Sequence, residues 1–225
     1  MRNLGLAQNH PEILNQTITF SRQADETRGS TAGVRAGESL SVRELLYGLM
    51  LPSGNDASVA LAEHFGGRFA TDRSVRKATP FQRFIIQMNR RAKQLGMTQT
   101  RFANPHGLTA EDHHTTASDL LQLAYQAMQL PAFRNYVSTR QHGCTLIDQA
   151  GKQRNVVWKN TNRLLATEGY LGVKTGTTSA AGACLVSAAQ RGNRQLLMVV
   201  LGASSSDARY TDSRNLYRWA WQRLK

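Results

Sequence analysis

The hydrophobic periodicity of the chain changes at about residue 140, and this change limits the fold more than any other feature. Before it, apolar residues recur every three or four positions, as on one face of a helix. After it, they form short continuous or alternating runs that are typical of strands, and a helical pattern returns at the end. Helices first, then an antiparallel sheet, then a covering helix predict an α+β fold with segregated layers.

The earlier part of the chain is predicted to be mainly helical, with helices at about 41–50, 55–65, 80–95 and from about 116 onward. Ser41 and Glu44 form a capping-box pattern at the start of the first helix. Pro52 interrupts that helix, while Gly66–Gly67 and Gly96 end the next two.

The later part of the chain is predicted to form short strands at 156–158, 171–175, 183–189 and 196–201. The last two strands flank Arg191-Gly192-Asn193-Arg194, which is typical of a hairpin turn. A closing helix is predicted over about 206–224, and the first 40 residues are expected to be loop or short strands.

The chain is strongly basic, with 28 Lys and Arg against 15 Asp and Glu and a formal net charge of +13. The basic residues are scattered from Arg2 to Arg223, without a long run or an interleaved aromatic platform. This pattern disfavours nucleic-acid binding and fits attraction to a polyanionic surface, such as an anionic cell envelope. The apolar fraction of 40% is that of a globular protein, which excludes the disordered and fibrous classes.

Residues 1–15 carry polar and charged groups throughout, so no secretory signal peptide is predicted. Taken literally, this predicts a cytoplasmic product; the alternative is a chain that starts too late. Cys144 and Cys184 do not have the spacing of a zinc site. Cys184 is expected to be a small buried residue, and a disulfide between the two cysteines stays open.

Two short motifs point to chemistry. Ser53-Gly54-Asn55, taken alone, indicates a turn followed by a helix start, and Lys174-Thr175-Gly176, taken alone, indicates a solvated strand edge. Their order along the chain carries more information. A Ser/Asn triplet followed by Lys-Thr-Gly is typical of the penicillin-binding proteins and serine β-lactamases, after a first Ser-x-x-Lys motif.

Three longer segments extend this match. They are residues 37–61 (GESLSVRELLYGLMLPSGNDASVAL), 100–119 (TRFANPHGLTAEDHHTTASD) and 160–187 (NTNRLLATEGYLGVKTGTTSAAGACLVS). Together they resemble the low-molecular-mass D-alanyl-D-alanine carboxypeptidases, a family of penicillin-binding proteins, over about residues 20 to 220. The resemblance implies a β-lactamase/transpeptidase-like fold, with an antiparallel sheet of about five strands, covering helices and a mainly helical lobe.

The resemblance implies serine acyl transfer, in which an activated serine attacks the peptide carbonyl between two D-alanines and the acyl-enzyme is then hydrolysed. Ser53 would relay a proton among the lysine, the nucleophile and the leaving amine. Asn55 would hold the amide side of the substrate. Lys174 would place a positive charge near the terminal carboxylate. No metal and no organic cofactor is implied.

The strand after Lys174 is implied to bind the substrate through Thr175, Gly176 and Thr177. The hydroxyl groups of Thr175 and Thr177 would donate hydrogen bonds, and the backbone N–H of Thr177 would form half of an oxyanion hole. A strand edge suits this purpose because it presents backbone N–H groups in a rigid line.

The sequence departs from the family pattern at its first motif. No Ser-x-x-Lys precedes Ser53; the one present, Ser74-Val75-Arg76-Lys77, follows it in a polar context and is interpreted as a coincidence. We therefore expect residues 1–225 to be a single, N-terminally truncated catalytic domain, with a helical lobe at about 41–138 and a sheet portion at about 140–225. This chain is expected to be inactive alone.

The implied partners are peptidoglycan stem peptides ending in D-Ala-D-Ala, with β-lactam antibiotics if the full-length protein is active, and no nucleic acid. The implied location of the full-length protein is the cell envelope. Two alternatives stay open. One is a class A β-lactamase-like hydrolase, which would be expected to show Ser-Asp-Asn and a carboxylate base; the other is a non-catalytic peptidoglycan-binding relative.

Overall fold

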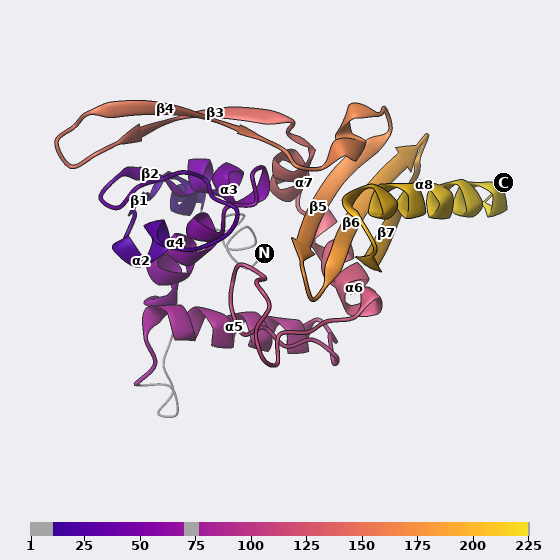
Figure 1. Ribbon diagram of the computed structural model, residues 1–225, viewed down its shortest axis with the longest axis horizontal. Helices are drawn as coiled ribbons and strands as arrows, with labels where there is room; N and C mark the ends of the chain where they lie inside the picture. Colours follow the sequence, from indigo (N-terminus) through magenta and orange to yellow (C-terminus); the bar gives the residue numbers. More distant parts are fainter. Residues whose placement is uncertain (1–10, 70–76, 225) are drawn as a thin grey trace.

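The computed structural model describes residues 11–69 and 77–224 (Figure 1). In chain order, the elements are η1 (Pro11–Asn15), β1 (Thr17–Thr19), α2 (Arg22–Asp25), β2 (Ser39–Ser41), α3 (Val42–Met50), α4 (Asn55–Gly66), α5 (Pro80–Gln94), α6 (Ala117–Met128), α7 (Pro131–Ser138), β3 (Gln141–Ile147), β4 (Gln153–Lys159), η3 (Arg163–Ala166), β5 (Tyr170–Thr178), β6 (Gly182–Arg191), β7 (Arg194–Ala203) and α8 (Ser206–Arg223). The predicted α+β class is confirmed. Within the described ranges, no helix combines the length and apolarity needed to cross a bilayer.

The strands form two antiparallel sheets. In the described part of the chain, one sheet has the order β1-β2-β3-β4 and the other the order β5-β6-β7. Figure 1 shows α8 lying across the second sheet, while the long β3–β4 hairpin extends above α3 and away from β5. The expectation of one sheet of about five strands is therefore wrong for the described residues. The physical reason is that β3 pairs with β2, through Ser39 opposite Ile147, and the hairpin contributes no strand to the second sheet.

The helix starts follow the predicted capping chemistry. The Ser41 side chain accepts a hydrogen bond from the backbone N–H of Glu44, which satisfies one of the free donors at the start of α3. At α5, Thr79 and Gln82 form a complete capping box, and Pro80 occupies the first turn. The predicted hairpin turn is confirmed, because Arg191 pairs with Arg194 at the end of β6 and β7.

Of the elements longer than five residues, α7 and β3 were not predicted. Pro131 stands at the start of α7, a position that proline favours and that was a usable signal. In β3, only Cys144 and Leu146 are buried, so the alternation is short and weak. Both cysteines are free, and Cys184 is only partly buried, so the expectation that it is a buried residue is wrong.

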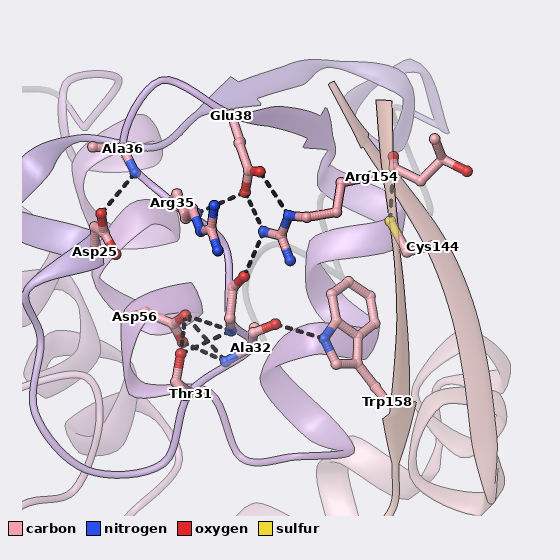
Figure 2. Close-up of polar contacts among 12 residues, drawn as sticks. Asp25, Thr31, Ala32, Arg35, Ala36, Glu38, Asp56, Cys144, Arg154 and Trp158 are labelled. Carbon is pink, nitrogen blue, oxygen red and sulfur yellow. Dashed lines mark hydrogen bonds and ion pairs between the residues drawn. The ribbon is translucent and has the colours of Figure 1, made fainter. Parts of the chain in front are cut away.

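The main core joins α3, α4 and the β3–β4 hairpin. Val42 and Leu45 of α3, together with Leu51 after it, are fully buried. Trp158 of β4 is 3% exposed, and its indole N–H donates to the backbone carbonyl of Ala32 at 2.8 Å (Figure 2). This contact satisfies the polar end of a large apolar side chain, so the hairpin is attached to the loop before β2.

Asp56, in the first turn of α4, is the polar centre of the helical lobe (Figure 2). Its side chain is 1% exposed and accepts hydrogen bonds from the Thr31 hydroxyl at 2.7 Å, the Ala32 N–H at 2.8 Å and the Gly33 N–H at 3.2 Å. A buried carboxylate is tolerated only with such donors. Asp56 therefore fixes the loop at 31–33 against the start of α4.

An ion pair holds the end of the same loop. Arg154 of β4 donates to both carboxylate oxygens of Glu38, at 2.9 and 2.5 Å, and to the carbonyl of Gly33 (Figure 2). The Arg154 guanidinium holds the pKa of Glu38 below its usual value. The loop is thus fixed from α4 on one side and from β4 on the other.

Asp56→Ala is expected to lower the free energy of unfolding by about 3 kcal/mol, because the buried N–H groups of Ala32 and Gly33 and the Thr31 hydroxyl lose their acceptor. Asp212→Ala, at an exposed position of α8, serves as the matched control and should change stability by less than about 0.5 kcal/mol. Urea unfolding followed by circular dichroism measures both. Equal losses in the two variants would contradict this account of Asp56.

Candidate active site

Ser53 lies in the turn between α3 and α4, in a conformation that few residues adopt. Its φ is 66°, one of the two positive values among described non-glycine residues. Gly54 follows because a Cβ there would lie 2.7 Å from Asp56 Oδ1 and 2.8 Å from the Gly48 carbonyl oxygen. The turn therefore packs too closely against α3 and Asp56 for any other residue, and it presents Ser53 at the start of α4.

Asn55 begins α4 and is 6% exposed. Its side-chain amide donates to the carbonyl of Arg28 at 2.8 Å, and its backbone N–H donates to the carbonyl of Ser30 at 2.8 Å. Gly29 lies so near that a Cβ there would stand 2.5 Å from Asn55 Nδ2. Asn55 is thus held by the loop at 28–30, and its role toward a substrate stays a prediction.

Lys174 of β5 is brought to Ser53 across 121 positions of sequence. Its Nζ donates to Ser53 Oγ at 2.8 Å and to the Thr175 carbonyl at 2.9 Å. Burial lowers the pKa of Lys174 to about 8, and the positive charge of Arg209 acts in the same direction. The two motif residues therefore form one serine–lysine pair, in which the amine has a lowered pKa.

The three residues after Lys174 differ in exposure. Thr175 is 8% exposed, and its hydroxyl is hydrogen-bonded to the Thr161 hydroxyl at 2.7 Å, so it is engaged within the protein. Gly176 and Thr177 are exposed. In the described residues, β5 pairs only with β6, which leaves backbone groups along its other edge without a strand partner. That edge is suited to bind an extended peptide; the roles of Thr175, Gly176 and Thr177 remain predictions.

Arg209 of α8 contacts β5, and it was not among the residues predicted from the sequence. Its side chain is 8% exposed, and Nη1 donates to the Thr177 hydroxyl at 2.9 Å and to the Gly176 carbonyl at 3.1 Å. A signal was present, because Arg209 lies at four- and eight-residue spacing from the buried Ser213 and Tyr217 of the same helix. An arginine on the core-facing side of a helix indicates a buried partner.

The loop at 104–109 closes the helical side of the site. The Asn104 side chain donates to the Leu108 carbonyl and accepts from the Gly107 N–H, which fixes the turn. The Thr109 hydroxyl then donates to the Thr178 hydroxyl at 2.9 Å, so this loop contacts the end of β5. Ser74, the serine of the one Ser-x-x-Lys, lies outside the described residues.

A profile of the D-alanyl-D-alanine carboxypeptidase family, peptidase family S11, matches residues 6–205. The chain is 36% identical over 204 residues to the D-alanyl-D-alanine carboxypeptidase of Streptomyces sp. strain K15, covering 90% of this chain and 68% of that protein. The crystal structure of the Streptomyces K15 DD-transpeptidase superposes with a TM-score of 0.88 at 34% identity, covering 98% of this chain and 84% of that one. The chain belongs to the D-alanyl-D-alanine carboxypeptidase family, as the sequence resemblance implied.

Other relatives are longer. The chain is 34% identical to the D-alanyl-D-alanine carboxypeptidase DacF of Bacillus subtilis over 87% of its own length, but it spans 46% of that protein. It is 30% identical to the D-alanyl-D-alanine endopeptidase of Escherichia coli and spans 59% of it. Family membership therefore does not by itself give the activity or the substrate of the whole protein.

The buried amine of Lys174 makes stability depend on pH. Its pKa is about 8 in the folded state and 10.5 as the ordinary value. Between these values the unfolded state binds more protons, so this group makes the free energy of unfolding rise with pH. We expect Lys174→Met to be more stable than the parent at neutral pH. Removing the desolvated charge should raise the free energy of unfolding by up to about 3 kcal/mol, and the loss of the hydrogen bonds of Lys174 reduces this gain.

The gain should shrink as the pH rises from 8 to 10.5, because the folded amine is then neutral and proton binding by the unfolded state becomes steadily weaker. Urea unfolding at intervals across the window measures the difference. Lys159→Met, at an exposed position of β4, is the control and should show no such trend. A difference between Lys174→Met and the parent that does not change with pH would exclude a desolvated amine at this position.

Proposed function

We propose that this protein acts on peptidoglycan stem peptides that end in D-Ala-D-Ala, by serine acyl transfer at the site formed by Ser53, Asn55 and Lys174. The observation that carries the proposal is the 2.8 Å contact between Lys174 Nζ and Ser53 Oγ, which joins the two motifs of a penicillin-binding protein. The family membership of the chain supports the same reaction class.

Recognition of the terminal carboxylate is assigned to the end of β5. Lys174 and Arg209 supply two cations, and the Thr177 hydroxyl stands within 2.9 Å of Arg209 Nη1. Charged donors bind a carboxylate about twice as strongly as neutral ones. The free edge of β5 adds backbone N–H groups that bind an extended peptide and its carbonyl oxygen.

Proton transfer is assigned to Ser53 and Lys174. With a pKa of about 8, the amine of Lys174 takes up and releases a proton near neutral pH, and Ser53 passes it to the reacting atoms. Asn55, fixed by its bonds to the Arg28 and Ser30 carbonyls, would orient the amide side of the substrate with its side-chain oxygen.

The 225-residue chain is proposed to bind the stem peptide without releasing D-alanine. No Ser-x-x-Lys precedes Ser53 in its sequence, and that motif supplies the nucleophile in the family. A form of the protein that carries this motif before Ser53 would cleave the peptide, would be acylated by β-lactam antibiotics, and would work in the cell envelope.

The test compares binding of diacetyl-L-Lys-D-Ala-D-Ala with binding of the same peptide carrying a C-terminal amide, by titration calorimetry. We expect the acid to bind and the amide to bind at least about tenfold more weakly, since charge-assisted hydrogen bonds contribute about 1.5–3 kcal/mol each. D-alanine is assayed in the same samples, and none should be released.

Arg209→Lys should weaken binding of the acid by about tenfold and leave the amide unchanged, because lysine lacks the planar fork of arginine. Arg214→Lys, exposed on the same helix, is the matched control. Equal affinity for acid and amide, or no binding of either, would refute carboxylate recognition at this site.

A further inference from the structure

We propose that Thr161 and Tyr210 are positioning residues for the serine–lysine pair. Neither belongs to the Ser-Gly-Asn or the Lys-Thr-Gly motif. Thr161 lies in the loop between β4 and η3, and Tyr210 lies near the start of α8. The inference rests on the proposed function only in taking Ser53 and Lys174 as the centre of the site.

Thr161 is exposed, yet each of its three polar groups bonds to a different segment of the protein. Its backbone N–H donates to the carbonyl of Leu51, two residues before Ser53, at 3.1 Å. Its hydroxyl is hydrogen-bonded to the Thr175 hydroxyl at 2.7 Å, and its carbonyl accepts from the Tyr210 hydroxyl at 3.0 Å. Thr161 therefore connects the α3–α4 turn, β5 and α8, the three segments that form the site.

The serine–lysine pair depends on how the turn and the strand lie relative to each other. Ser53 and Lys174 are in contact at 2.8 Å across 121 positions of sequence. A separation of about 3.6 Å is no longer a hydrogen bond, so a shift of less than about 1 Å between the two segments breaks the pair. Thr161 bonds to Leu51 and Thr175, which are close in sequence to the two partners, and so fixes their separation.

Tyr210 holds the Thr161 carbonyl and is itself firmly fixed. Its side chain is 2% exposed, and its hydroxyl accepts from the backbone N–H of Arg163 at 3.3 Å. The guanidinium groups of Arg163 and Arg209 lie over its ring, 4.5 and 5.1 Å from the centroid. Such cation–π contacts are attractive. The hydroxyl of Tyr210 is therefore a fixed donor to which the loop of Thr161 is attached.

Loss of the Thr161 hydroxyl should change the surroundings of Lys174. Thr175 then loses its bond to the loop, the separation between Lys174 and Ser53 becomes variable, and water reaches the amine. A hydrated amine returns toward its ordinary pKa of 10.5, from the value of about 8 that burial gives it. A role of Thr161 in general stability alone would leave this pKa unchanged in the folded protein.

The experiment follows the titration of Lys174 by NMR in protein that carries isotope-labelled lysine, without ligand, and Lys174→Met identifies the signal. The parent should titrate near pH 8. Thr161→Val should raise the pKa of Lys174 by about one unit, and Thr161→Ser, which keeps a hydroxyl, should titrate like the parent. Thr145→Val is the matched control, because the Thr145 hydroxyl bonds to Asn155 at 2.9 Å on the β3–β4 hairpin. It should also titrate like the parent.

Tyr210→Phe keeps the ring and removes the hydroxyl, so it should raise the pKa of Lys174 in the same way as Thr161→Val. Tyr217→Phe is its matched control. Tyr217 is equally buried on α8, but its hydroxyl bonds to the Ser187 hydroxyl at 3.0 Å. Urea unfolding of each variant shows that it is folded under the conditions of the titration.

The proposal is overturned if Thr161→Val and Tyr210→Phe titrate like the parent, or if Tyr217→Phe shifts the pKa of Lys174 as far as they do. The titration uses no ligand, so a failure to bind the stem peptide does not affect its outcome. Conversely, selective binding of the acid peptide beside an unchanged titration would remove the positioning role and leave the proposed function standing.

Discussion

The buried carboxylate of Asp56 is the interaction on which the helical part of the site depends. It collects the hydrogen-bond donors of residues 31–33 around the first turn of α4. The same loop receives the indole N–H of Trp158 and the guanidinium of Arg154, so the β3–β4 hairpin is fixed to it as well. Gly54 must be small because it lies between Asp56 and α3, and the position of Ser53 follows from that packing.

The β5-β6-β7 sheet contributes a group of the opposite charge to Asp56, the Lys174 amine, which is costly to bury as a cation. Lys174 is held near Ser53 although burial disfavours its charged form, and Arg209 adds a second positive charge. This burial lowers the stability of the protein at neutral pH, because the unfolded state binds the proton more tightly. Such a balance, in which stability is given up for a tuned amine, is common where a group must change protonation during chemistry.

Local elements were predictable from sequence because their signals are local. The capping residue Ser41 and the Arg191–Arg194 turn are decided within a few residues. The Ser53–Lys174 pair was predictable only because both motifs stand in a known order. Arg209 and the pairing of β3 with β2 depend on contacts between distant parts of the chain, which no window of sequence contains. The buried state of Asp56 was missed for the same reason, since an acidic residue in a first helical turn also fits an exposed position.

The two residues of the serine–lysine pair come from different parts of the fold: Ser53 from the turn between α3 and α4, and Lys174 from β5. The pair exists only when the helices and the second sheet are both folded and docked against each other. A chain on the ribosome, or one opened by a protease, therefore has a free serine in one place and an ordinary lysine in another. The contact between Lys174 and Ser53 forms only when both parts are in place, so it reports complete folding.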